Sequence, residues 1–207
     1  MINLNFSYFG GRDYIDIAQI CYRAMYPFFG DDYSSCTWFY IAIHKAVMPV
    51  AVLLEKTEFE KFPAESFEIA AKLRFQKNGT FDYEGYICNP LHFQIQEIGI
   101  LVKEAYQEPE YLEGVHYRLD SDKIQFLKPI KTQWPVFFTI MLLGRFAAQH
   151  FYGSIKPRAV AIDSAGLPSI EQLPTLHGLI GGKPHRGIIK VPTYFGGRFV
   201  GNGMVKI

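Results

Sequence analysis

The feature that most constrains the fold of this chain is an apolar segment, residues 134–151. Its most apolar stretch, residues 134–143, is too short to span a bilayer, which takes about 20 residues, and Arg145 follows it closely. Arranged as a helix, the segment is apolar on nearly every face. In a soluble protein such a helix is buried, so the pattern predicts a central helix with the rest of the chain packed around it.

The size and composition suit a soluble protein with an aromatic core or contact surface. The length of 207 residues fits one domain, or one domain with an appendage, and such a chain buries roughly 70% of its unfolded surface. With 18 Phe and 13 Tyr, much aromatic area must face the core or a partner. The three scattered cysteines predict free thiols in a reducing compartment. The first residues lack the basic and apolar regions of a secretory signal, and the longest apolar run is too short to span a bilayer, so we expect a soluble protein with no membrane segment.

Alternation of apolar and polar side chains predicts most of the strands. Pro49 lies within one of these runs and favours an edge or bulged strand there, because proline cannot donate a ladder hydrogen bond. The predicted strands are residues 2–8, 37–43, 47–54, 81–88, 159–162, 188–191 and 199–206.

Helical spacing predicts two helices in the first half of the chain. Asp13 can cap the first helix, which carries an apolar stripe over residues 17–28. The second begins at Pro63, a residue type favoured in the first turn of a helix. It runs to about residue 75, because Phe67, Ala71 and Phe75 recur at intervals of four.

The remaining elements predict an α+β protein. Apolar side chains alternate over residues 115–119 and 124–126 around a turn-forming Asp-Ser-Asp sequence, which predicts a β-hairpin. The order of helices and strands is irregular and has no internal repeat, which favours α+β over a doubly wound sheet. We therefore predict a mixed or antiparallel sheet, a buried helix at residues 134–151 and a C-terminal β extension. The core domain would be residues 1–155, and residues 156–207 a Gly/Pro-rich basic extension or arm.

The C-terminal segment carries the clearest functional signal. Residues 172–207 contain eight glycines, five Lys or Arg and no Asp or Glu, although the whole chain has a net charge of only +1. Such asymmetry suggests contact with an acidic or phosphate-bearing partner, either another protein or a nucleic acid. The predicted partner-binding residues are Lys183, Arg186, Lys190, Tyr194, Phe195, Arg198, Phe199, Gly201 and Gly203.

No catalytic or cofactor motif stands out. His44 follows a predicted strand and lies near Ser34, Ser35 and Cys36 in sequence, so it could serve as a base for a nucleophile, but an ordinary strand-end histidine is the simpler interpretation. His177 and His185 have no acidic or cysteine neighbours that would complete a metal site. Neither a Walker A nor a G-x-G-x-x-G sequence occurs. We predict no catalytic residues, no metal and no cofactor.

A short hairpin sequence, EGVHYRL at residues 113–119 and KIQF at 123–126, resembles a hairpin found in virion structural proteins of tailed bacteriophages. In those proteins the position of His116 is usually acidic. The resemblance implies a neck, tail or baseplate component that assembles with other virion subunits in the host cytoplasm. It transfers no catalytic residue.

Two alternatives remain open. The predicted elements of residues 2–88 could form the βαββαβ order of a ferredoxin-like unit. With the Gly-Asn-Gly sequence at residues 201–203, this order resembles RNA-processing proteins of CRISPR systems, which implies RNA contact through Gly201 and Gly203 and a base role for His44. A small-molecule acyltransferase, with paired strands over residues 39–54, is the third possibility. The sequence favours the noncatalytic assembly protein, acting through the C-terminal residues 178–207.

Overall fold

The computed structural model describes residues 1–6, 15–91, 117–127, 135–154, 157–168, 176–179, 183–195 and 197–207. The helices within these ranges are α1 (Ile17–Phe29), α2 (Lys56–Phe59) and α4 (Pro135–Tyr152). The first strands are β1 (Ile2–Asn5), β2 (Cys36–Ile43), β3 (Val50–Glu55), β4 (Phe67–Lys77) and β5 (Phe81–Pro90). The others are β6 (Tyr117–Leu119), β7 (Lys123–Phe126), β8 (Arg158–Ser164), β9 (Leu176–Leu179), β10 (Ile188–Phe195) and β11 (Arg198–Lys206).

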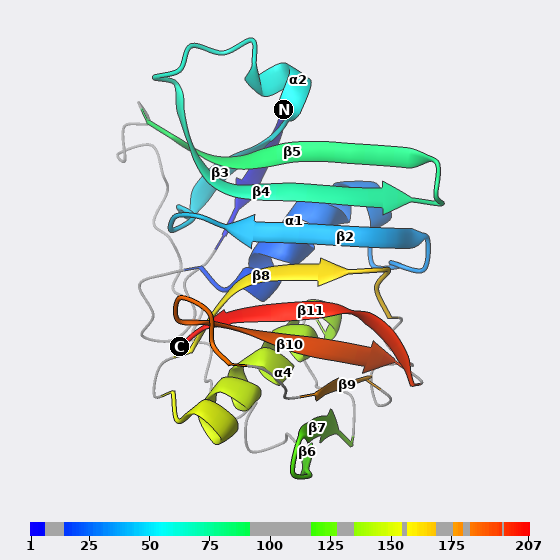
Figure 1. Cartoon of the computed structure of the whole chain (residues 1–207). Helices are drawn as coiled ribbons and strands as arrows, with labels where there is room; N and C mark the ends of the chain where they lie inside the picture. The colour runs from blue at the N-terminus through cyan, green and yellow to red at the C-terminus, as the bar shows by residue number, and fades with distance from the viewer. Residues whose placement is uncertain are drawn as a thin grey trace.

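One antiparallel sheet dominates the protein (Figure 1). Its eleven strands follow the order β1-β3-β5-β4-β2-β8-β11-β10-β9-β7-β6. Every strand pairing in it is antiparallel. The predicted α+β class was therefore wrong: a single large sheet carries the fold, and α1 and α4 lie together behind it.

The sheet consists of two halves that repeat one plan. In the first half, three strands separate β1, which precedes α1, from β2, which follows it. In the second half, three strands likewise separate β7, which precedes α4, from β8, which follows it. The halves join where β2 pairs with β8. The two halves share the order and arrangement of their helices and strands but not their side chains, so the sequence shows no sign of the repeat.

Helix α1 begins where Asp16 caps it. The Asp16 backbone is extended, and its carboxylate accepts a hydrogen bond of 2.8 Å from the backbone N–H of Ala18. The cap lies three residues beyond Asp13, the predicted one, which is outside the described residues. The predicted stripe is buried at Ile20 and Cys21. Pro27 lies inside the last turn.

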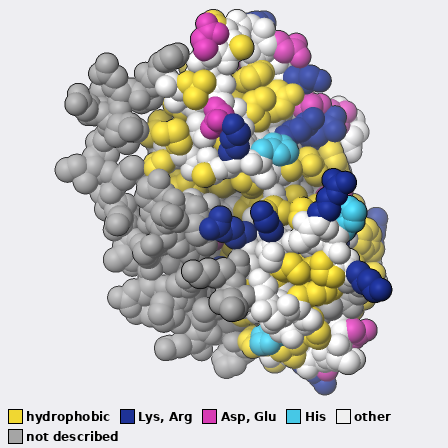
Figure 2. All heavy atoms as spheres, turned by 60° about the vertical axis from the view of Figure 1, so that its left-hand side comes forward, with side chains coloured by type: hydrophobic (Ala, Val, Ile, Leu, Met, Phe, Trp, Pro, Cys, Tyr) yellow, Lys and Arg dark blue, Asp and Glu magenta, His cyan; other side chains and the backbone are white. Residues whose placement is uncertain are grey.

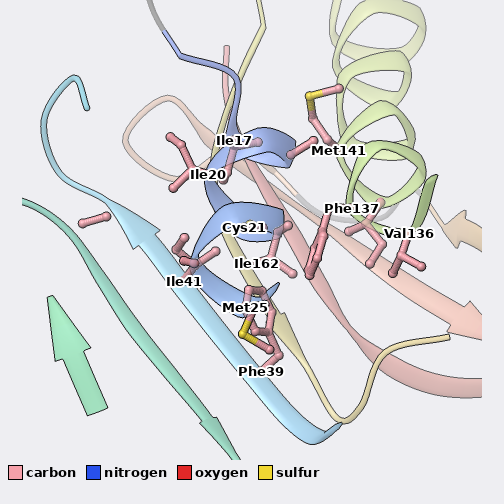
Figure 3. Packing of buried hydrophobic residues seen from close by; sticks show 14 of the residues in the cluster. Ile17, Ile20, Cys21, Met25, Phe39, Ile41, Val136, Phe137, Met141 and Ile162 are labelled. Atoms are coloured by element: carbon pink, nitrogen blue, oxygen red, sulfur yellow. The ribbon is translucent and has the colours of Figure 1, made fainter. Parts of the chain in front are cut away.

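The core fills the space between the two helices and the sheet (Figure 3). Phe137 of α4 is buried and packs on Tyr33 and Phe39, with ring centroids 5.1 and 5.5 Å apart. Met25 of α1 and Ile162 of β8 complete this region between the two halves. A single continuous cluster of buried side chains therefore joins the halves into one folding unit.

Helix α4 occupies the position predicted for a helix at residues 134–151, but it is not buried on every face. Gln149 and His150 are exposed. On its inner face, Gly144 lets the helix approach β11, because a Cβ there would lie 2.6 Å from a methyl group of Val205. Near its C-terminal end, Phe146 stacks on Tyr117 at 4.9 Å. Tyr117 belongs to the β6–β7 hairpin, so the predicted hairpin is confirmed in residues 117–126.

The helix predicted from Pro63 to residue 75 is wrong, because β4 runs through these residues and pairs with β2 and β5. The βαββαβ order needed for a ferredoxin-like unit is therefore absent from the described part of residues 2–88. The paired strands predicted over residues 39–54 are also wrong, since β2 pairs with β4 and β8, whereas β3 pairs with β1 and β5. Strand β3, which Pro49 precedes, is not at an edge.

The C-terminal residues lie in the sheet. Strand β8 pairs with β2 of the first half, and β11 lies between β8 and β10. Along β11, Gly201, Gly203 and Val205 are buried and alternate with more exposed residues. Residues 156–207, predicted as an extension or arm, thus supply β8, β9, β10 and β11 to the same sheet as the core residues.

Candidate ligand-binding site

A cleft of about 280 Å³ opens at the join between the two halves. The last paired residues of β2 and β8 at this end are Ala42 and Ala161. Beyond them Ile43 and Val160 are no longer paired with each other, and both line the cleft. The first turn of α1, the middle of α4 and the end of β11 form the remaining walls. We call this space the seam cleft.

The floor of the seam cleft is apolar. Ile17 and Ile20 of α1 and Met141 of α4 line it and are all buried. Ile15 and Val47, from the segments before α1 and after β2, are buried there as well. Because both helices are held by the main core, this floor is a fixed surface. A pocket with such a lining favours the apolar part of a small ligand.

One carboxylate lies in the cleft wall, and its main role is local. Asp16 is only 5% exposed, and it caps α1 through Ala18. Burial of a carboxylate is costly unless the charge is hydrogen bonded, and the cap supplies such a bond. The thiol of Cys21 lies nearby: burial, and then the charge of Asp16, raise its pKa well above the usual value. The same negative charge would oppose deprotonation of any acid placed at this end of α1.

Basic side chains surround the mouth. The cationic and polar lining residues other than Asp16 are His44, Lys45, Arg145, Arg158 and Lys206. Arg145 lies one turn after Met141, so α4 presents its cation directly beside the apolar floor. Lys45 is paired with the carboxylate of Glu68. Figure 2 shows the end of the sheet that carries the mouth, with Lys and Arg side chains gathered across the middle and hydrophobic surface around them.

Arg158 and Lys206 are cross-strand neighbours at this mouth. The register of β8 and β11 places their Cα atoms opposite each other, and both side chains are exposed. Directly opposed residues in an antiparallel pair project from the same face, with Cβ atoms about 5 Å apart. The ladder therefore places the two residues side by side on one face of the sheet. Val205, the neighbour of Lys206, is buried against α4, so this face is the one turned away from that helix.

The predicted partner-binding residues lie elsewhere and do not form one cluster with the cleft. Tyr194 stacks on His177 at 5.4 Å and meets the ring of Phe199 edge-on at 5.6 Å, near the turn between β10 and β11. Arg198 and Phe199 are exposed there, and Phe195 is the last residue of β10. Lys183, Arg186 and Lys190 are exposed at or before the other end of β10.

Gly201 and Gly203, the two remaining predicted contact residues, are buried in the middle of the sheet. A Cβ on Gly201 would lie 2.0 Å from the backbone oxygen of Asp163, so glycine allows β11 to approach β8 closely. Among the described basic residues of the C-terminal segment, Lys206 lines the seam cleft, and it is not one of the predicted partner-binding residues. No local motif marks it, because its partners come from distant parts of the chain.

The possible nucleophile site around His44 is not assembled. His44 follows the last residue of β2, whereas Cys36 is the first residue of the same strand. The Cys36 thiol donates to the backbone oxygen of Trp38, and burial raises its pKa to about 12. Such a thiol is scarcely ionised at neutral pH. His44 is exposed and instead lines the seam cleft.

No group of three or more His, Cys, Asp or Glu side chains with metal-binding geometry occurs among the described residues. None of the helices described by the structure is long and apolar enough to cross a membrane.

Comparison with known proteins gives a likeness in fold only. No protein-family model and no curated protein matches the chain. Among solved structures, the fold is similar to that of a tesB protein from Mycobacterium avium subspecies paratuberculosis, with a TM-score of 0.50 and 7% sequence identity. The alignment covers 99% of this chain and 92% of that one.

Proposed function

We propose that this protein binds a small amphipathic anion in the seam cleft. The observation that supports the proposal is the combination of a buried apolar floor with a mouth that carries Lys45, Arg145, Arg158 and Lys206. Asp16, the one carboxylate among the described lining residues, caps α1. The apolar part of a ligand would lie on the floor and its negative group at the mouth.

Hydrophobic burial and electrostatic attraction together favour an amphipathic anion over a neutral or cationic ligand. Each methylene group that leaves water for the floor contributes about 0.8 kcal/mol. The clustered cations raise the local concentration of anions and strengthen their hydrogen bonds. A cation would meet repulsion from the same groups. The β8–β11 ladder fixes the Cα positions of two of these residues, whereas their long side chains lose conformational freedom when an anion binds.

The proposal is tested by isothermal titration calorimetry with octyl sulfate and with 1-octanol, which has the same tail and no charge. We expect one octyl sulfate per chain at pH 7.5, and at least tenfold weaker binding of 1-octanol. Replacing Val160, a half-buried wall residue, by Trp would fill the cleft and abolish binding of both. Arg145→Met should weaken octyl sulfate roughly tenfold, because a hydrogen bond to a charged group contributes about 1.5 kcal/mol or more.

Lys61→Met is the matched control, because Lys61 is exposed and does not line the cleft. It removes one positive charge and should leave octyl sulfate binding within about twofold of the wild type, since exposed charges separated by more than about 10 Å are largely screened at 0.1 M salt. Equal loss in Lys61→Met and Arg145→Met would show that net charge, and not the cleft, attracts the ligand. Octyl sulfate binding that survives Val160→Trp would contradict the proposal outright.

An assembly role is a second candidate, supported by the exposed tip of the β10–β11 hairpin. Phe199 is 48% exposed and packs on Tyr194, with Arg198 beside it. An exposed aromatic ring next to arginine has the composition of an interface centre. The partner would be another subunit of a virion, as the hairpin at residues 113–126 suggests, and no ligand in the cleft is needed.

Truncation cannot test this role, because removing residues 177–207 would remove β10 and β11 from the interior of the sheet. The double substitution Arg198→Glu and Phe199→Ser changes only the exposed tip. In the assembly account it leaves the unfolding midpoint unchanged but abolishes self-association measured by sedimentation velocity. A wild-type chain that stays monomeric at high concentration would argue against self-assembly. RNA binding through Arg198 would instead appear as salt-dependent RNA retention that Arg198→Ala weakens.

A further inference from the structure

The seam cleft ends in the packed core between α1 and α4. Ile20 of α1 and Met141 of α4 line its floor and are buried. Cys21, the next residue of α1, and Phe137, one turn before Met141, do not line the cleft and are buried as well. Figure 3 shows Ile20 and Met141 close to the start of α1, and Cys21 and Phe137 further along the space between the helices. The cleft therefore has an end wall, which consists of Ile20 and Met141.

The side chains behind the end wall leave no room for a ligand. Cys21 of α1, Ile41 of β2 and Ile162 of β8 are all buried and belong to the continuous cluster that joins the two halves. Protein interiors are packed about as densely as organic crystals, and an inserted methylene group forces side chains or backbone to move. An alkyl chain longer than the cleft would therefore have to turn back toward the mouth.

The volume of the cleft sets the length of chain that it can hold. Its 280 Å³ lies just below the range of about 300–1,000 Å³ that is typical of small-molecule pockets. An apolar cavity of about 150 Å³ binds benzene, which corresponds to roughly 25 Å³ for each carbon atom. On that scale the seam cleft holds about eleven such groups. The anionic group at the mouth occupies part of this space, which leaves about eight carbon atoms for the tail.

We infer that the seam cleft selects amphipathic anions with an apolar tail of about eight carbon atoms, and that Ile20 and Met141 set this limit. The inference rests on the proposed binding of amphipathic anions and specifies their tail. Carbon atoms beyond the limit would lie at the mouth, where charged side chains replace the apolar lining. Each further methylene group would then gain little, because the gain depends on the apolar area that leaves water.

The limit is tested by calorimetry on the full chain at pH 7.5 with butyl, hexyl, octyl and decyl sulfate, each below the concentration at which it forms micelles. A methylene group that moves from water to apolar surface tightens binding about fourfold. We therefore expect binding to tighten about fifteenfold from hexyl to octyl sulfate, but by less than about threefold from octyl to decyl sulfate. The four compounds share one headgroup, so contacts at the mouth do not contribute to these ratios.

Substitution of Met141 by Ala removes the side chain that contributes most length to the end wall. Buried cavities left by such truncations are only partly refilled by their surroundings. The step from octyl to decyl sulfate should therefore increase to about tenfold, whereas hexyl sulfate should bind within about threefold of the wild type. Met141→Leu keeps the volume and should keep the wild-type limit. Met204→Ala is the matched control, because Met204 is a half-buried residue of β11 that does not line the cleft, and it should also keep the limit.

Thermal unfolding followed by circular dichroism establishes that each variant is folded before the titrations. If Met141→Ala is unfolded, Ile20→Val provides the same test with the loss of one methyl group. It should increase the step from octyl to nonyl sulfate from less than about twofold to about fourfold.

The outcomes separate the length limit from the proposed function. A steady gain of about fourfold for each methylene group up to decyl sulfate in the wild type would overturn the length limit and leave the binding of amphipathic anions intact. A step from octyl to decyl sulfate that is the same in the wild type and in folded Met141→Ala would overturn the role of the end wall. Failure of every alkyl sulfate to bind would instead overturn the proposed function itself.

Discussion

Substitution of Gly201 by Ala gives the sharpest test of how the C-terminal segment is built into the sheet. Gly201 lies in β11 opposite Ser164 of β8. Its φ is 155°, and a Cβ there would lie 2.0 Å from the backbone oxygen of Asp163 and 2.5 Å from the Cα of Ser164. Both atoms belong to the backbone of β8, so no side chain can move aside. The two strands would have to separate at the centre of the sheet.

The size of the effect follows from two costs. Overpacking in an interior costs about 1–3 kcal/mol, and a positive φ that favours glycine costs about 1–3 kcal/mol for another residue. We therefore expect Gly201→Ala to lower the free energy of unfolding by about 3–5 kcal/mol. In a chain of this length each kcal/mol shifts the melting temperature by about 2–4 °C, so the loss should be roughly 6–20 °C.

Two glycines of the same strand region serve as matched controls. Gly197 has a φ of 81° but open space around its Cβ position, so Gly197→Ala should cost only the backbone term of about 1–2 kcal/mol. A Cβ on Gly203 would lie 3.8 Å from the backbone oxygen of Ile140, which is an ordinary contact. Gly203→Ala should therefore be neutral, or stabilising by up to about 1 kcal/mol.

The assay is urea unfolding followed by circular dichroism, with the three variants and the wild type measured together. The expected order of destabilisation is Gly201→Ala, then Gly197→Ala, then Gly203→Ala. If Gly201→Ala were as mild as Gly203→Ala, the close approach of β11 to β8 would be wrong. The C-terminal residues would then be better described as the loosely attached arm that their charge suggested.

Two further predictions concern ionisable groups. Cys21, Cys36 and Cys88 are buried, and burial raises the pKa of both Cys36 and Cys88 to about 12. None of the three should therefore react with a thiol reagent at pH 8 until urea unfolds the chain. Rapid labelling of the native protein would contradict this burial. A hydrogen bond from Lys72 holds the pKa of Glu84 below its usual value of 4.5, so Glu84 stabilises the fold above that pH and loses this contribution as the pH falls through its lowered pKa. Glu84→Gln should therefore lose less stability than the wild type between pH 5 and pH 3 in urea titrations, and an unchanged pH dependence would show that the ion pair contributes nothing.

The sequence patterns predicted strands better than they distinguished a strand from a helix. Phe67, Ala71 and Phe75 recur at intervals of four, which suits one face of a helix. Four is also an even number, so the same spacing suits a strand, and these residues form β4. A bulge between Ile69 and Ala71 then places Phe67 against a separate small cluster, whereas Ala71 and Phe75 belong to the main core. Pro63 then lies before the strand and not in a helical turn. Only the pairing of β4 with its neighbours, which is non-local, decides between the two.

The place of the C-terminal segment in the sheet is hidden in the sequence for a related reason. Its basic residues suggest an outward-facing arm, but Lys190 of β10 lies between the buried Ile189 and Val191, and Lys206 of β11 follows the buried Val205. Gly201 and Gly203 stand where a strand usually carries apolar side chains, so the alternation typical of a half-buried strand was hidden. The charge asymmetry is real, but it describes the outer positions of an interior strand and not a separate element.

The candidate site was almost invisible in the sequence. Its residues come from the start of α1, the ends of β2 and β11, the start of β8 and the middle of α4. These segments lie far apart in the sequence. Among these residues the sequence suggests a chemical role only for His44, as the base of a nucleophilic site. In the structure that site is not formed, because β2 separates His44 from Cys36. The opening itself arises because β2 and β8 stop pairing after Ala42 and Ala161, and a sequence gives no direct sign of where a ladder ends.

The most direct test of the account is a crystal structure of the protein with octyl sulfate. We predict the alkyl chain on the floor beside Ile20 and Met141, and the sulfate at the mouth of the seam cleft. Octyl sulfate bound at another surface, or a cleft that stays without it at concentrations that saturate the calorimetric signal, would contradict the account.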